Sequence, residues 1–151
     1  MRRINVVAGI RSVFDRENFF QLFNLEENFL IDTAKLDAAY LRLYDVLNKQ
    51  LLETSNDVEK EFLNSYLAML NEGYDVLKDD MKRAEHLILQ NDTSIPIPSQ
   101  AFISSVFDSS EEDIEGMKLD IRTAMVSAFK KRDFENAALA YAKLKVLSKL
   151  N

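Results

Sequence analysis

Apolar residues recur at helical spacing along much of the chain, most clearly in two adjacent stretches, residues 33–51 and 56–77. Because successive residues of a helix are rotated by about 100°, each stretch gathers its apolar side chains on one face. A short polar turn near residues 53–56 separates the stretches, which predicts an antiparallel helical hairpin. The residues expected on the two contact faces are Leu36, Tyr40, Leu43, Leu47 and Leu51 in the first helix, and Phe62, Tyr66, Leu70, Tyr74 and Leu77 in the second.

The C-terminal half predicts three further helices, each preceded by a polar residue that can accept hydrogen bonds from the first backbone N–H groups. Ser99 begins the first, in which Phe102 and Val106 are expected to face inward. Ser110 and Asp133 begin the other two. The whole chain holds only three glycines and two prolines, too few turn formers for many short strands. We therefore expect an all-α protein.

A linker is expected within residues 91–99, which read NDTSIPIPS. Proline lacks a backbone N–H and restricts the residue before it, so two prolines here disfavour a helix. We predict that residues 1–92 form one domain containing the hairpin and its flanking helices. Residues 93–99 would connect this domain to residues 100–151, an antiparallel three-helix bundle.

Composition excludes several kinds of chemistry. The 151 residues include no cysteine, which rules out disulfides, thiolate metal sites and a cysteine nucleophile. The single histidine, His86, is interpreted as a structural surface residue, and no catalytic triad, paired carboxylates or phosphate-binding loop is recognisable. We expect neither an enzyme nor a bound metal or cofactor. No apolar run approaches the roughly 20 residues of a membrane-spanning helix, so no membrane partner is expected.

Charged residues near the C-terminus form two adjacent blocks of opposite sign. Residues 108–120 hold six acids and one lysine, a net charge of −5, and residues 121–150 hold seven basic residues and two acids, a net charge of +5. We interpret the blocks as complementary faces of one bundle. A nucleic-acid site in the basic block is a less favoured alternative, because the chain as a whole has a net charge of −6.

Two surfaces are candidates for docking a partner. In the first hairpin helix, Lys35, Arg42 and Lys49 recur every seven residues and form a basic ridge away from the leucines. In the helix after Ser99, an outward apolar pair is flanked by small and acidic residues. An ordinary solvated face is the alternative for the ridge, and a second core contact for the pair. The residues of this second surface are Ile103, Phe107, Ser104, Asp108 and Glu111, to which Val146 of the last helix could add.

The first fourteen residues carry Arg2, Arg3 and Arg11 and no acid, which is the composition of an amphipathic targeting segment. A segment that packs on the domain is the favoured interpretation, because no serine- or alanine-rich extension and no cleavage signal is present. We accordingly expect a cytoplasmic protein, with the mitochondrial matrix as the alternative.

Several segments together match one known family in order along the chain. They are NFFQLFNL at 18–25, residues 36–52, LNEGYDVL at 70–77, MKRAEHLIL at 81–89, residues 101–112 and AALAYAKLKVLSKL at 137–150. Together these segments resemble the HscB family, J-type co-chaperones of iron–sulphur cluster assembly, and MKRAEHL with its spacing from the hairpin is the most specific of them. The resemblance implies an N-terminal J domain and a C-terminal three-helix bundle.

The resemblance also implies two protein partners. An IscU-type scaffold would bind the C-terminal bundle, and a DnaK-type chaperone would bind the J domain. The scaffold-binding residues of the family would correspond to the second surface described above. Ser104 and Val146 are smaller than the residues that the family usually presents there.

The chain departs from the family at the tip of the hairpin. J domains stimulate the ATPase of their chaperone through a His-Pro-Asp tripeptide, and the corresponding residues here are Asn48, Lys49 and Gln50. Without the proline, the first helix is expected to continue through Leu51 and Leu52. The resemblance therefore implies a scaffold-binding protein whose stimulation of the chaperone is lost or strongly reduced. A helical interaction or regulatory module without iron–sulphur partners is the alternative.

Overall fold

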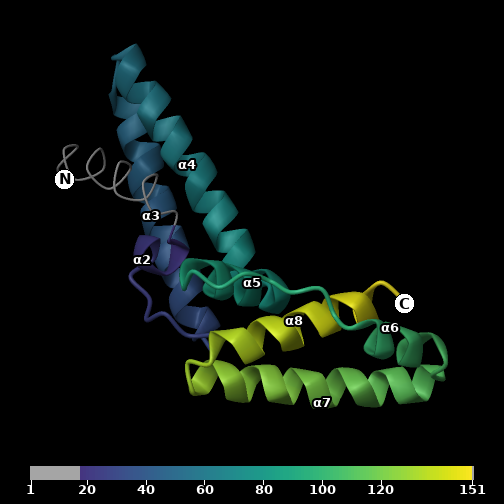
Figure 1. Ribbon diagram of the computed structural model, residues 1–151. Coiled ribbons are helices and arrows are strands. Elements are labelled where there is room, and N and C mark those ends of the chain that lie inside the picture. The colour runs from purple at the N-terminus through teal and green to yellow at the C-terminus, as the bar shows by residue number, and fades with distance from the viewer. Residues whose placement is uncertain (1–17, 151) are drawn as a thin grey trace. The chain divides into compact units, whose positions relative to one another are not determined.

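The computed structural model describes residues 18–150, and within that range it contains helices and no strand (Figure 1). The predicted all-α class is confirmed. Residues 1–14, for which a segment packing on the domain was favoured over a targeting segment, lie outside the described residues. The helices are α2 (Phe19–Leu22), α3 (Thr33–Glu53), α4 (Asp57–Lys78), α5 (Asp80–Gln90), α6 (Gln100–Phe107), α7 (Glu111–Lys130) and α8 (Phe134–Ser148).

Polar side chains cap the helices where the sequence predicted them. Ser99 Oγ accepts the Phe102 N–H at 3.1 Å, and Ser110 Oγ accepts the Asp113 N–H at 3.1 Å. These bonds satisfy backbone donors that have no partner within the helix. The same kind of bond is made at α3 by Asp32, at α4 by Asn56 and at α8 by Asp133.

Helices α3 and α4 form the predicted hairpin, joined by residues 54–56. Helix α3 continues through Leu51 and Leu52 to Glu53, as expected from the missing proline. The predicted contact face of α4 is wrong in one position, because Leu63 is 2% exposed whereas Phe62 is 37% exposed. Fully buried leucines fill the contact, namely Leu36, Leu47, Leu70 and Leu77.

A polar network joins the two hairpin helices beside this apolar contact. Tyr74 Oη donates to Asp37 Oδ1 at 2.6 Å and accepts from Lys78 Nζ at 2.6 Å. The hydrogen bond to Tyr74 and the nearby Asp37 carboxylate raise the pKa of Lys78. Tyr40 stacks on Tyr74 with ring centroids 4.2 Å apart. Since the bonds span both helices, they fix the register of the hairpin.

Helix α2 packs on α4 where α4 carries a glycine. Phe19, in α2, lies so close to Gly73 that an added Cβ would stand 2.7 Å from ring atom Cδ1. Leu22 is the next neighbour, at 3.2 Å. The missing side chain is therefore what lets the aromatic ring of α2 reach the backbone of α4.

We expect Gly73→Ala to destabilise the protein by about 1–3 kcal/mol, because the new methyl group overlaps a buried ring. The matched control is Gly116→Ala in α7, where nothing lies within 4 Å of the added Cβ. That control should stabilise by up to about 1 kcal/mol, the ordinary helix preference for alanine. Urea unfolding followed by circular dichroism measures both changes, and equal midpoints for the two variants would contradict this packing.

The described residues divide into two compact units. The first contains residues 18–27 and 31–82, and the second contains residues 28–30 and 83–150. The division therefore falls near Lys82, earlier than the linker predicted at residues 93–99. Residues 83–90 of α5 belong to the second unit, where Glu85 accepts a hydrogen bond from Tyr141 of α8 and lies near Lys145. Ala84, Leu87 and Ile88 in the same stretch are buried.

Helix α8 is the centre of the second unit and packs against α7 (Figure 1). Four of its alanines are buried, so neighbouring helices can approach closely on more than one side. On another side, Tyr141 Oη donates to Glu85 Oε2 of α5, and Lys145 Nζ lies 3.7 Å from the same oxygen. The buried residues of α8 are Ala137, Ala138, Ala140, Tyr141, Ala142, Leu144 and Leu147. Helical spacing in the sequence predicts that five of them share one face, namely Ala137, Ala140, Tyr141, Leu144 and Leu147.

Arg83 is a buried cation of the second unit that the sequence analysis missed. It is 4% exposed, its Nε donates to the Phe29 carbonyl oxygen at 2.6 Å, and its guanidinium lies 4.8 Å from the Phe29 ring centroid. The Phe29 ring also stacks on the ring of Phe129, with the two centroids 5.1 Å apart. Arg83 therefore holds the short segment 28–30 in the unit through a hydrogen bond and a cation–π contact.

Candidate protein-docking surface

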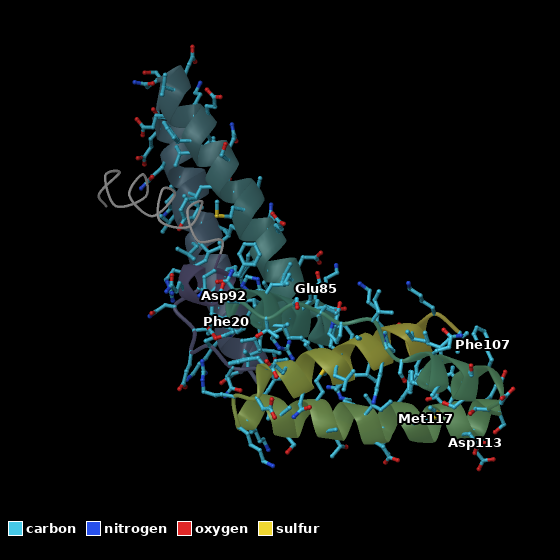
Figure 2. The ribbon with its side chains drawn as sticks, in the orientation of Figure 1. Phe20, Glu85, Asp92, Phe107, Asp113 and Met117 are labelled. Atoms are coloured by element: carbon cyan, nitrogen blue, oxygen red, sulfur yellow. The ribbon has the colours of Figure 1, made fainter. Side chains whose placement is uncertain are left out.

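Helix α6 has one inward and one outward side. Val106 is 1% exposed, and the half-buried Phe102 ring lies 5.3 Å from Lys143 Nζ of α8. These two contacts confirm the predicted inward residues. The opposite side ends at Phe107, which is labelled in Figure 2 and is 73% exposed. A phenylalanine exposed to this extent has little role in packing and is a candidate contact for a partner.

The other predicted members differ in how much of them reaches the surface. Ser104, Asp108 and Glu111 are exposed, whereas Ile103 and Val146 are half-buried. Five of the six come from α6, its last turn and the first residue of α7, and Val146 comes from α8. We call the six residues Ile103, Ser104, Phe107, Asp108, Glu111 and Val146 the docking surface.

Hydrogen bonds close the turn that carries this surface. The Asp108 N–H donates to the Ser104 carbonyl oxygen at 3.3 Å, which ends α6. Ser109 Oγ donates to the Ser105 carbonyl oxygen at 2.7 Å and lies 3.9 Å from Met117 Sδ of α7. The turn is therefore tied to both helices, so Phe107 is presented from a defined backbone.

The acids nearest to Phe107, Asp108 and Glu111, make no ion pair among residues 18–150. Within the described residues, the acids of 108–120 make one ion pair, Glu115 with Lys118 at 3.2 Å, and this pair lies inside the acidic block itself. The helices that carry the two charged blocks, α7 and α8, pack on each other, but no ion pair joins the blocks among the described residues. Asp108, Glu111 and their neighbours in the first turn of α7 are exposed, leaving an acidic border beside an apolar group.

The basic ridge of α3 is also exposed. Lys35, Arg42 and Lys49 point to solvent along one side of the helix and make no ion pair in the described part of the chain. Asn48 is half-buried, and Gln50 is 4% exposed. Of the three residues that correspond to the J-domain tripeptide, the third is therefore in the core of the hairpin and has no direct access to a partner.

Gln50 is buried, but its side-chain amide lacks hydrogen bonds within the described residues. Neither its Nε2 nor its Oε1 has a hydrogen-bond partner among residues 18–150. A buried amide without partners costs free energy, since it has lost its bonds to water. The position is thus an apolar site of the hairpin occupied by a polar side chain.

We expect Gln50→Met to stabilise the protein by about 1–2 kcal/mol, because methionine has a similar length and no polar group to desolvate. Gln100→Met, at an exposed helical position, is the matched control and should change the unfolding free energy by less than about 0.5 kcal/mol. Chemical denaturation measures the difference. A Gln50→Met variant less stable than the parent would show that the amide has partners after all.

Two other kinds of site are absent from residues 18–150. No helix there is both long enough and apolar enough to cross a membrane. No group of three or more histidine, cysteine, aspartate or glutamate side chains there is arranged to hold a metal ion.

The sequence is similar to bacterial proteins named co-chaperone protein HscB homolog. It is 27% identical over 105 residues to the one from Colwellia psychrerythraea, covering 70% of this chain and 60% of the relative. It is 37% identical over 71 residues to that of Pseudoalteromonas atlantica, covering 47% and 41%. It is 28% identical over 136 residues to that of Burkholderia mallei, covering 83% and 75%. The chain thus spans less than two thirds of the first two relatives, and it matches no protein-family model.

Two solved structures share the fold. The crystal structure of human co-chaperone protein HscB superposes with a TM-score of 0.76 over 87% of this chain and 77% of the human one, at 21% identity. Chaperone HscB from Vibrio cholerae superposes with a TM-score of 0.72 over 88% of this chain and 93% of that one, at 20% identity. At this level of identity the structures establish the helical architecture.

Proposed function

Because this chain belongs to the HscB family of co-chaperones, we propose that it is a non-enzymatic protein of iron–sulphur cluster assembly that binds an IscU-type scaffold through the docking surface. Its contact with a DnaK-type chaperone, in this proposal, no longer stimulates ATP hydrolysis. The family resemblance suggests which two proteins are the partners. The exposed residues of this chain suggest where the scaffold binds.

The exposure of Phe107 is the observation that carries the proposal. Aromatic side chains dominate the binding energy of many interfaces, because one ring removes a large apolar area from water when it enters a pocket of the partner. Ser104 and Asp108 lie beside it on the same exposed side of α6 and can form a polar border. A complementary scaffold would offer an apolar pocket with basic residues around it.

The acidic border favours a partner whose contact surface is positively charged. Asp108 and Glu111 are exposed and make no ion pair within the described range, so a basic patch on the scaffold would meet no competing ion pair from those residues. Exposed charges of this kind mainly accelerate encounter and set orientation, and salt screens them. Affinity should therefore depend on Phe107, and the salt dependence of association on the acids.

The proposed loss of ATPase stimulation is based on the course of helix α3. The helix is continuous through residues 48–50, so the loop in which J domains present their tripeptide is absent at that point. Lys35, Arg42 and Lys49 keep a basic ridge that an acidic chaperone surface can still approach. We propose weak, unproductive docking there.

A pull-down with immobilised IscU-type scaffold tests this function. The parent protein should be retained, and the charge reversal Glu111→Lys should be retained less, with the difference shrinking above about 0.5 M salt. Glu72→Lys is the matched control, because Glu72 is also exposed but lies on α4. If the parent is not retained, the chain is instead a helical interaction module without an iron–sulphur partner.

A further inference from the structure

Helix α7 carries a second outward face, separate from the docking surface. The face that packs on α8 contains Met125 and Phe129, which are buried. Rotated away from it is a shallow hollow along the helix, and Leu119 within it is 67% exposed. Six residues line the hollow: Leu119, Arg122, Thr123, Val126, Ser127 and Lys130.

Charge and size change along this face in a definite order. Glu112 and Glu115 are at its N-terminal end, and Lys130 is at its C-terminal end. The middle holds the two apolar residues Leu119 and Val126, about two helical turns apart. Arg122 lies between them in the sequence, and its guanidinium is 5.8 Å from the Phe29 ring centroid. Gly116, Thr123 and Ser127 are small enough to let another helix approach.

This order makes the face complementary to itself when one copy is reversed. In an antiparallel pair of helices, residues meet when their numbers have a constant sum. A sum of 245 pairs Leu119 with Val126, and the same sum pairs Glu115 with Lys130. A single register thus satisfies the apolar contact and the charge contact, and the two-fold axis repeats each of them.

We propose that the outer face of α7 binds the α7 face of a second copy of this chain, antiparallel and with the two-fold axis between Arg122 and Thr123. The interface is small, because it consists of one helix face from each copy. Stable specific interfaces bury roughly 1,200–2,000 Å², so the dimer is reversible and populated at high protein concentration. The proposal is independent of the scaffold and uses none of the docking-surface residues.

Charge-swap variants test the pairing. In sedimentation equilibrium at up to about 1 mM of the 151-residue chain, the apparent mass should rise from 17.4 kDa toward twice that value. Lys130→Glu should weaken dimerisation at least about 5-fold, because it sets two like charges together at both symmetric contacts. Adding Glu115→Lys to that variant should restore it, and Lys131→Glu, an exposed control one residue away, should leave it unchanged. A monomer at every concentration, or no rescue by the double variant, overturns the proposal.

Single cysteines test the orientation, since the natural chain has none. In the proposed register, residue 123 of one copy and residue 123 of the other are offset by about 2 Å along the helix axis. Mild oxidation of the Thr123→Cys variant should therefore yield a disulfide-linked dimer. Glu112→Cys is about 31 Å from its copy and should not cross-link. Both positions are exposed. Equal cross-linking of the two variants would indicate a parallel or unspecific contact and overturn the antiparallel one, and circular dichroism confirms that each variant is folded.

Discussion

Replacing Phe107 by alanine is expected to weaken binding of an IscU-type scaffold by about 30-fold or more. The ring is 73% exposed in the free protein, so its loss leaves the fold of α6 intact while removing the main apolar contact. Truncation of an aromatic anchor commonly costs about 2 kcal/mol or more, which corresponds to that factor in the dissociation constant. Isothermal titration of scaffold with each variant measures it.

The control for this variant is Leu52→Ala. Leu52 is 87% exposed on α3, in the other compact unit, and offers a similar loss of exposed apolar surface. It should bind the scaffold like the parent. If Leu52→Ala and Phe107→Ala weaken binding equally, the scaffold does not use the docking surface. Unchanged thermal unfolding of Phe107→Ala excludes a general loss of structure.

The second large effect concerns the chaperone. A DnaK-type chaperone should hydrolyse ATP at its basal rate when this protein is added at saturating concentration, whereas an intact J protein stimulates it strongly. Residues 48–50 are the reason, because they continue α3 and bury Gln50 where J domains present a histidine, a proline and an aspartate. Single-turnover ATP hydrolysis measures the effect, and stimulation on the scale of the intact J protein would refute the loss.

Reinstating the tripeptide should not simply restore stimulation. Lys49→Pro introduces a ring into a helix that continues for another four residues, at a cost of about 3 kcal/mol. Gln50→Asp replaces a buried amide with a buried carboxylate, which is costly without a cation beside it. The hairpin has therefore accommodated the altered residues in its packing, and activity cannot be separated from stability at this position.

Much of the fold could be predicted, because the signals that specify it are local. Helix caps such as Ser99 and Asp133 act within one helical turn, and periodicity alone identified five of the seven buried residues of α8. The continuation of α3 also followed from a local cause, the absence of proline. The exposed position of Phe107 followed from its angle relative to Phe102 and Val106.

The features that could not be predicted depend on contacts distant in sequence. Arg83 is buried because residue 29 supplies both a carbonyl oxygen and a ring, and nothing near Arg83 in the sequence signals this. Similarly, α5 was assigned to the first domain because the proline-rich segment follows it, whereas Tyr141 and Lys145 hold it in the second unit. The opposite net charges of the two neighbouring blocks did not predict ion pairs, because an ion pair requires two side chains to lie close together in the folded structure.

Scaffold binding by the full chain is the most direct test of the proposed function. In a calorimetric titration at low salt, an IscU-type scaffold should give a saturable one-to-one isotherm with this protein, and Phe107→Ala should shift it to about 30-fold weaker binding. Heats of dilution alone, at scaffold concentrations up to several hundred micromolar, would contradict the assignment of the α6 end as a scaffold-docking surface.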